Sequence, residues 1–207
     1  MNQALAQLLA DRLATLPFAD PSAGARVTGL ARLHTGTVND GEAARTVKLP
    51  VPAAWSADEC ARDQRYLTPD EGTPSTWFFE DYGTAETRLA GNVYGQLATL
   101  RLLGWLNPSR LSGPLSENQL LQALSNALRV RVRHDAGEYR GLLITATALP
   151  AEASLFARYS YATETPLLLP PYRLVGLELK CAYVPAPACP VAALPTITPA
   201  APCPSFY

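Results

Sequence analysis

The sequence LAGNVYGQLATLRLLGWL, residues Leu89–Leu106, is the stretch on which the fold class depends. It is apolar over most of its length. Its mixed period and its three glycines, Gly91, Gly95 and Gly104, favour a long bent strand with apolar side chains on both faces. A helix over the same residues is the competing interpretation. We adopt the strand, which makes this stretch part of a sheet.

Helices are predicted on both sides of this stretch. Leucines spaced three and four residues apart predict an amphipathic helix over Asn2–Leu16, which ends at Pro17. Ser116–Gln119 has the pattern of a capping box, and the leucines after it place one apolar face on a helix that extends to Leu128. Two shorter helices are predicted at Ala57–Gln64 and Ala151–Tyr159.

Alternation of apolar and polar residues predicts the remaining strands. Arg26–His34 and Thr46–Val51 flank the turn signal Asn39-Asp40-Gly41 and are expected to form a β-hairpin. Pro50 and Pro52 confine its second strand to the edge of a sheet, because proline cannot donate a ladder hydrogen bond. Further strands are expected at Arg129–His134, Tyr139–Leu149 and Tyr172–Val184.

Helices and strands are interspersed without strict βαβ alternation, so the predicted class is α+β. We expect a mixed or antiparallel sheet packed by the N-terminal and the central amphipathic helix. The 207 residues allow one substantial core. We therefore assign one domain to residues 1–184 and an extended arm to residues 185–207.

Charge and composition exclude several classes of function. The net charge of −1 gives no global case for binding nucleic acid or an anionic membrane. The first 18 residues lack the pattern of a secretory signal, and no stretch is suited to cross a bilayer as a helix. We expect a soluble protein made in a cytoplasm, in which its four cysteines are reduced thiols. Their spacing does not fit a zinc site.

The C-terminal arm is the most unusual feature of the sequence. From Pro185 to Tyr207 it holds seven prolines and no charged residue. Disordered tails stay soluble through charge and polarity, so this segment is expected to lie on a protein surface. As a polyproline II helix it would reach roughly 70 Å, further than the domain is wide, at about 40 Å. Contact with a neighbouring subunit and wrapping on its own domain are both open. Its apolar contact candidates are Val191, Leu194, Ile197, Phe206 and Tyr207.

Two further segments are candidate interfaces. Arg129, Arg131 and Arg133 fall on one face of an alternating strand, where they form either a local basic ridge for phosphates or acidic partners, or a solvated face. Trp77, Phe78, Phe79 and Tyr82 form either an aromatic interface or part of the core. In a strand Trp77 and Phe79 share one face and Phe78 takes the other, so at least one aromatic ring is expected outward or in a second layer.

Residues for catalysis are few. His34 and His134 are the only imidazole bases, and neither lies in a metal-binding or hydrolase motif. Cys60 could pair with a histidine as a nucleophile, but nothing near it in the sequence supports this. An acidic cluster could hold a divalent cation, but solvated loop charge explains it as well; its members are Asp58, Glu59, Asp63, Asp70 and Glu71. We predict no enzyme activity, cofactor or metal.

The order of elements resembles that of tail-terminator and tail-completion (neck) proteins of tailed bacteriophages and phage-like particles. The likeness covers an N-terminal helix at Asn2–Leu16, early strands, a long sheet segment at Leu89–Leu106, a packing helix at Ser116–Leu128 and a closing strand at Tyr172–Val184. It implies a homo-oligomeric ring, commonly a hexamer. Such a ring ends a tail tube, contacts other tail or neck proteins and resides in the virion after assembly in the bacterial cytoplasm.

Two other classes of function remain open from the sequence. One is a monomeric module that binds a peptide or glycan through the aromatic segment and the arm. The other is an enzyme of unrecognised type that uses Cys60 or the acidic cluster. The size of the protein in solution separates the ring from the monomeric module.

Overall fold

The structure, a computed structural model, describes residues 2–39, 44–55, 66–89, 94–111, 113, 115–131, 139–160 and 166–185. Within these ranges it is an α+β fold with one six-stranded mixed sheet and two α-helices, as predicted. The main elements are α1 (Asn2–Leu13), β1 (Arg26–Asn39), β2 (Ala44–Pro52), β3 (Ser75–Arg88), β4 (Tyr94–Leu106), α2 (Glu117–Leu128), β5 (Tyr139–Leu149) and β6 (Arg173–Pro185).

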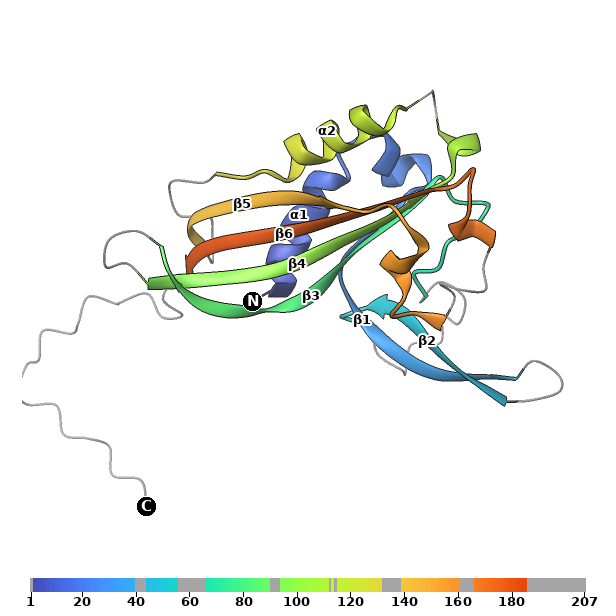
Figure 1. The fold of residues 1–207 in the computed structure, drawn as a ribbon, viewed down its shortest axis with the longest axis horizontal. Coiled ribbons are helices and arrows are strands. Elements are labelled where there is room, and N and C mark those ends of the chain that lie inside the picture. Colours follow the sequence, from blue (N-terminus) through green and yellow to red (C-terminus); the bar gives the residue numbers. More distant parts are fainter. Residues whose placement is uncertain are drawn as a thin grey trace, which may run out of the picture.

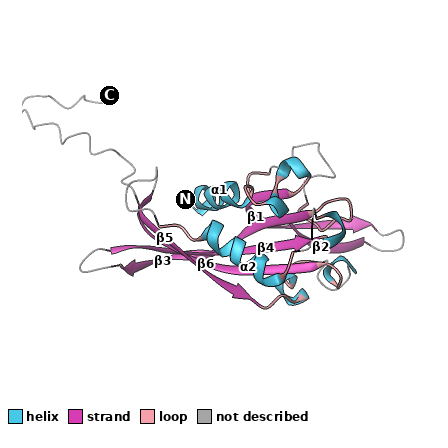
Figure 2. Cartoon of the chain, turned by 90° about the horizontal axis from the view of Figure 1, so that it is seen from above, coloured by secondary structure: helices cyan, strands magenta, loops and turns pink. Residues whose placement is uncertain are grey.

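The strands of the sheet are ordered β2-β1-β3-β4-β6-β5. The pair β1–β3 is parallel, and the other pairs are antiparallel. Both helices lie on the same side of the sheet (Figure 1), and the view from above shows them across its strands (Figure 2). The end of β6 and the tip of the β1–β2 hairpin lie at opposite ends of the molecule in both views.

The predicted hairpin is confirmed. β1 and β2 pair antiparallel from Ala31↔Pro52 to Asn39↔Ala44. The pairing of β1 with β3 covers only its first residues, Arg26 to Leu30, with a register shift on the way. Most of the hairpin is therefore a two-stranded ribbon that leaves the main sheet. β2 is an edge strand, as its prolines predict.

The long apolar stretch is a strand and not a helix. β4 begins at Tyr94 and pairs along its length with β3 and β6, which makes it a central strand. Its side chains are buried on both faces toward the Leu106 end, as the apolar pattern predicts. Residues 90–93, the first part of the predicted strand, lie outside the described residues.

The two predicted amphipathic helices are confirmed, with a shorter N-terminal one. α1 ends at Leu13 and not at Leu16, because Leu16 precedes Pro17 and takes an extended conformation. α2 begins with the predicted capping box, in which Ser116 accepts from the Gln119 backbone N–H and the Gln119 side chain accepts from the Ser116 N–H.

Neither of the two shorter predicted helices is found as an α-helix in the described residues. Ala151–Tyr159 holds only a 3-10 helix, Ala153–Phe156, and Ala57–Gln64 lies outside the described residues. Further 3-10 helices in the described ranges lie at Pro17–Ala19, Pro21–Ala23, Pro108–Arg110 and Pro166–Leu168.

The sheet separates two hydrophobic clusters. The larger lies between the sheet and the two helices and includes Leu5, Leu9, Trp77 and Leu124. The smaller lies on the other side, under the segments that follow β5, and includes Phe78, Trp105, Phe156, Tyr159 and Leu168. Because the sheet has apolar side chains on both faces, it needs the helices on one face and the segments after β5 on the other to keep them from water.

Trp77 packs directly on the backbone of β4. Gly104 lies opposite Trp77 in the β3–β4 register, and a Cβ atom at Gly104 would lie 2.0 Å from Cζ3 of the indole ring. The indole N–H donates to Ser75 Oγ at 2.8 Å, and the Ser75 hydroxyl donates to the Phe18 carbonyl at 2.6 Å. Glycine at position 104 therefore makes room for the ring that joins the sheet to the segment after α1.

We expect Gly104→Ala to destabilise the protein by about 1–3 kcal/mol or more, since the added methyl group overlaps a ring that cannot move without breaking the Ser75 hydrogen bond. Gly113→Ala is the control, because a Cβ there meets nothing within 4 Å. Urea unfolding measures both. Equal stability of the two variants would refute this account of Trp77.

Candidate functional site

The predicted aromatic segment divides between the two faces of β3, as strand alternation predicts. Trp77 and Phe79 lie in the cluster on the helix side, and Phe78 lies in the other cluster, edge-on to the rings of Phe156 and Tyr159. All three side chains are at most 1% exposed. The assignment of Trp77, Phe78 and Phe79 to an interface is therefore wrong, because they are core residues. Tyr82 alone of the four is exposed, at 43%.

Tyr82 belongs to a polar network around a buried carboxylate. Glu80 is 2% exposed, and it accepts hydrogen bonds from the hydroxyl groups of Tyr159 at 2.5 Å and Tyr82 at 3.2 Å. The Arg158 guanidinium lies 3.5 Å from Glu80 Oε1, and Arg101 stacks over the Tyr82 ring at 4.2 Å. These contacts compensate the burial of the Glu80 charge.

The charge state of Arg158 follows from the same network. Burial by itself lowers the pKa of Arg158, but the attraction of Glu80 and a hydrogen bond with Tyr82 raise it, and the net pKa lies above its ordinary value. The guanidinium therefore remains charged beside the carboxylate. We assign this network to holding Ala157–Ser160 against the sheet.

The arginine ridge is described only in part. Arg129 and Arg131 are exposed and Val130 between them is buried, which is the predicted alternation. Arg129 ends α2, and Arg131 forms an isolated bridge with Leu143 of β5. Arg133 lies outside the described residues. A contact of this ridge with phosphates stays a prediction.

The candidate catalytic residues are not brought together in the part of the chain that the structure describes. His34 lies in the hairpin, with its ring 5.2 Å from that of Trp55. His134, Cys60, the acidic residue Asp63 and the apolar residues of the arm lie outside the described residues. Among the described residues no group of three or more His, Cys, Asp or Glu side chains is placed to hold a metal ion. No described helix is long and apolar enough to cross a membrane.

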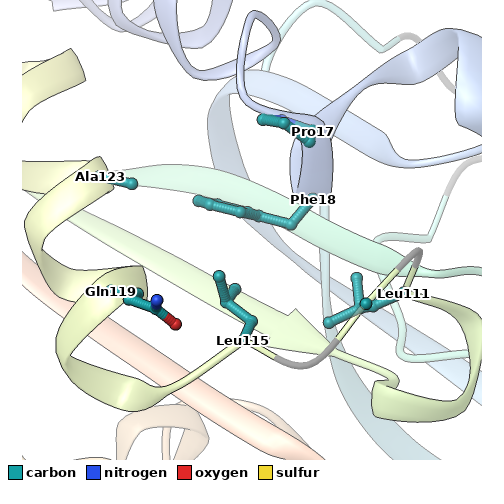
Figure 3. Close-up of a pocket in the computed structure, with 7 residues that line it drawn as sticks. Pro17, Phe18, Leu111, Leu115, Gln119 and Ala123 are labelled. Carbon is teal, nitrogen blue, oxygen red and sulfur yellow. The ribbon is translucent and has the colours of Figure 1, made fainter.

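An apolar groove that the sequence did not indicate lies between the segment after α1 and the start of α2 (Figure 3). Its volume is about 430 Å³. The described residues that line it include no charged side chain; they are Pro17, Phe18, Leu111, Gly113, Leu115, Gln119 and Ala123.

The groove is anchored to the core on several sides. The Phe18 ring lies 5.7 Å from the Trp77 ring, and its carbonyl accepts the Ser75 hydrogen bond. The Leu115 carbonyl accepts a hydrogen bond from the Arg173 guanidinium at the start of β6. Figure 3 shows the Phe18 ring pointing toward Ala123, with Leu115 on one side of it. The groove is therefore held open by contacts outside its own lining.

One weak signal for this groove was present in the sequence. Leu115 directly precedes the capping-box serine, the position from which a hydrophobic residue packs onto the first turn of a helix. Phe18 directly follows the proline that ends α1. Neither position indicates that the two residues lie on one surface, because that depends on how α1 and α2 pack.

Comparisons of this chain with protein-family models, with curated proteins and with solved structures each yield no match.

The Glu80 network predicts that Glu80→Gln destabilises the protein by about 1–3 kcal/mol, since an amide cannot replace the charged acceptor for Arg158 and both tyrosines. Glu178→Gln is the matched control. It removes a carboxylate two strands away that pairs with Lys180 at 3.6 Å near solvent, so its effect should be within about 0.5 kcal/mol. Urea unfolding measures the difference, and similar losses in the two variants would contradict a special burial cost at Glu80.

Cys181 should be chemically inert in the folded protein. It is a free, fully buried thiol, and burial raises its pKa from 9.0 to about 12. Alkylation by iodoacetamide at pH 8 should be about a thousandfold slower at Cys181 in the native protein than in urea, because the thiolate reacts and its fraction falls with the raised pKa. Peptide mapping by mass spectrometry measures both rates. Rapid native labelling of Cys181 would contradict its burial.

Proposed function

We propose that this chain is a structural subunit of a phage or phage-like particle. It forms a homo-oligomeric ring at the tail end or neck, where the ring terminates the tail tube and contacts neighbouring components. The resemblance implies that this ring is a hexamer. The element order and the α+β architecture support the proposal, since the sheet is covered by an N-terminal and a central helix as that resemblance implies.

The observation that carries the proposal is the position of two projecting segments. The β1–β2 ribbon leaves the main sheet after Leu30, and β6 ends in the chain that leads to the arm at the opposite end of the molecule (Figure 1). A subunit with contact segments at opposite ends is suited to head-to-tail contacts. Such contacts close into a ring when the rotation between subunits allows it.

The ribbon also has a physical reason to seek a partner. A two-stranded ribbon alone is marginally stable in water. Near its base the ribbon is supported by backbone hydrogen bonds from Ala53 to Leu30 and from Leu67 to Pro50. The Lys48 N–H, opposite Thr35, also donates to Ser160 at 2.8 Å. Closer to the tip Thr37 is exposed, which leaves that part of the ribbon available for a neighbouring subunit.

A monomeric peptide- or glycan-binding module is less well supported. That alternative relied on the aromatic segment, and three of its four rings are core residues. The apolar groove offers few polar groups for a sugar, since among its described lining residues only Gln119 has a side chain with a hydrogen-bonding group. Sugar hydroxyl groups that lose water need such partners.

The test is the mass of the full chain in solution, measured by light scattering and combined with negative-stain electron microscopy. We expect a ring with a central channel and a mass several times 22.2 kDa. Deletion of Pro185–Tyr207 should weaken this assembly and leave the urea unfolding of the domain nearly unchanged. A full chain that remains monomeric at high concentration, with or without tail proteins, would refute the proposal.

A further inference from the structure

The arm carries a repeat of three that matches the polyproline II helix. Every third residue from Ala188 to Phe206 is apolar; these residues are Ala188, Val191, Leu194, Ile197, Ala200, Cys203 and Phe206. Polyproline II has three residues per turn, so residues three apart share one face. The six prolines after Pro185, which itself ends β6, favour this conformation, and none of them falls in the repeat. In that conformation the arm would present one continuous apolar stripe.

We propose that the apolar stripe of one copy docks in the groove of a second copy, the groove lined by Phe18, Leu115 and Ala123. Proline-rich segments bind in apolar grooves with an aromatic floor, because the preformed helix loses little entropy on docking. Here an uncharged ligand meets a lining without a charged side chain. This arm contact rests on the proposed function in one respect only, which is that the partner is a second copy of the chain.

Gln119 supplies the polar contact that such a ligand needs. A polyproline II segment has no internal hydrogen bonds, so its carbonyl groups need outside donors. The capping box uses the Gln119 amide oxygen, which accepts from the Ser116 N–H at 3.0 Å. That contact orients the side chain and leaves its NH₂ group as the donor at the rim of the groove (Figure 3).

The position of the groove favours a second copy over the arm's own domain. The groove lies at the Arg173 end of β6, where Arg173 bonds to Leu115, and the arm leaves from the Pro185 end. The 13 residues of β6 separate these ends by about 40 Å. Of the arm's reach of roughly 70 Å, more than half would be used in returning to its own groove.

A return path along α2 would also bury little apolar surface. The outward side of α2 carries the exposed Gln122 and Asn126, and the exposed Arg129 follows at its C-terminal end. Gln122 and Asn126 are hydrogen-bonded to each other there. An apolar stripe gains nothing on such a surface. The groove of a neighbour lets more of the stripe be buried.

The decisive experiment is disulfide trapping between two different full-length copies. Both copies carry Cys60→Ser, Cys189→Ser and Cys203→Ala, and the buried Cys181 is kept. One copy also carries Ala123→Cys in the groove, which leaves Gln119 in place, and the other carries Leu194→Cys in the stripe. After mixing and mild oxidation, we expect a covalent dimer on a non-reducing gel from the mixture, and little from either copy alone.

The matched control moves the arm cysteine off the stripe. Ala193→Cys in place of Leu194→Cys should give several-fold less dimer with the Ala123→Cys copy, because residue 193 lies on another face of a helix with three residues per turn. Equal trapping at positions 193 and 194 would overturn the stripe. A copy carrying both Ala123→Cys and Leu194→Cys that yields only a cross-linked monomer would overturn the choice of a second copy.

Substitutions measure the energetic contribution of the contact. Leu194→Asp should weaken self-association about tenfold or more, since it removes a buried leucine, whereas Ala193→Asp adds the same charge off the stripe and should change it little. On the groove side, Ala123→Glu should weaken association as much, and Gln122→Glu on the outward face of α2 should not. Equal thermal unfolding of Ala123→Glu and Gln122→Glu confirms that the groove variant is folded.

The outcomes separate this contact from the ring. A ring that persists unchanged in Leu194→Asp and Ala123→Glu would overturn the arm contact and leave the proposed function standing. Specific trapping between Ala123→Cys and Leu194→Cys in a protein that forms no closed ring would support the arm contact and refute the proposed function.

Discussion

The contact of Trp77 with the backbone of Gly104 is the constraint on which the rest of the structure depends. It brings a large ring onto the helix-side face of a central strand pair, where only glycine on β4 leaves room. The other contacts follow from its position. The Trp77 indole donates a hydrogen bond to Ser75, the Ser75 hydroxyl donates to the Phe18 carbonyl, and the Phe18 ring packs against Trp77. The floor of the groove is thus an extension of the core, which gives a surface feature the rigidity of an interior one.

The same strand explains the second side of the molecule. With Trp77 and Phe79 on the helix side, alternation places Phe78 and Glu80 on the other face. Phe78 needs an apolar cover and Glu80 needs hydrogen-bond donors. The segment after β5 provides both, with Phe156 against the ring and Tyr159 and Arg158 at the carboxylate. A buried carboxylate beside aromatic rings costs free energy unless its hydrogen-bond and charge partners stay in place. Moving this segment would remove those partners from Glu80, so the segment is held in one position.

Patterns local in sequence predicted most of the fold, and contacts between distant segments accounted for the errors. The capping box at Ser116 and the edge strand with Pro50 depend on neighbouring residues and were predicted correctly. α1 was predicted too long because the leucine spacing continues to Leu16, where the proline that follows prevents a helical conformation. Burial of the aromatic segment and the groove both depend on how α1, α2 and the sheet pack together, which no local pattern contains. The alternation of the arginine ridge could be predicted from the sequence, but its position beside β5 could not.

At both edges of the sheet, prolines or existing hydrogen bonds leave fewer backbone groups for pairing with a strand of another subunit. On β2, Pro50 and Pro52 have no N–H to offer, the Lys48 N–H already donates to Ser160 at 2.8 Å, and the Pro50 carbonyl accepts from Leu67. On β5, the Ile144 N–H donates to the Val130 carbonyl, so part of that edge is covered by the chain after α2. In the proposed assembly, side-chain surfaces and appended segments are the alternative to strand pairing. There the arm of one copy would pair with the groove of the next, and the separation of the two along β6 would make the contact directional, as a ring of like subunits requires.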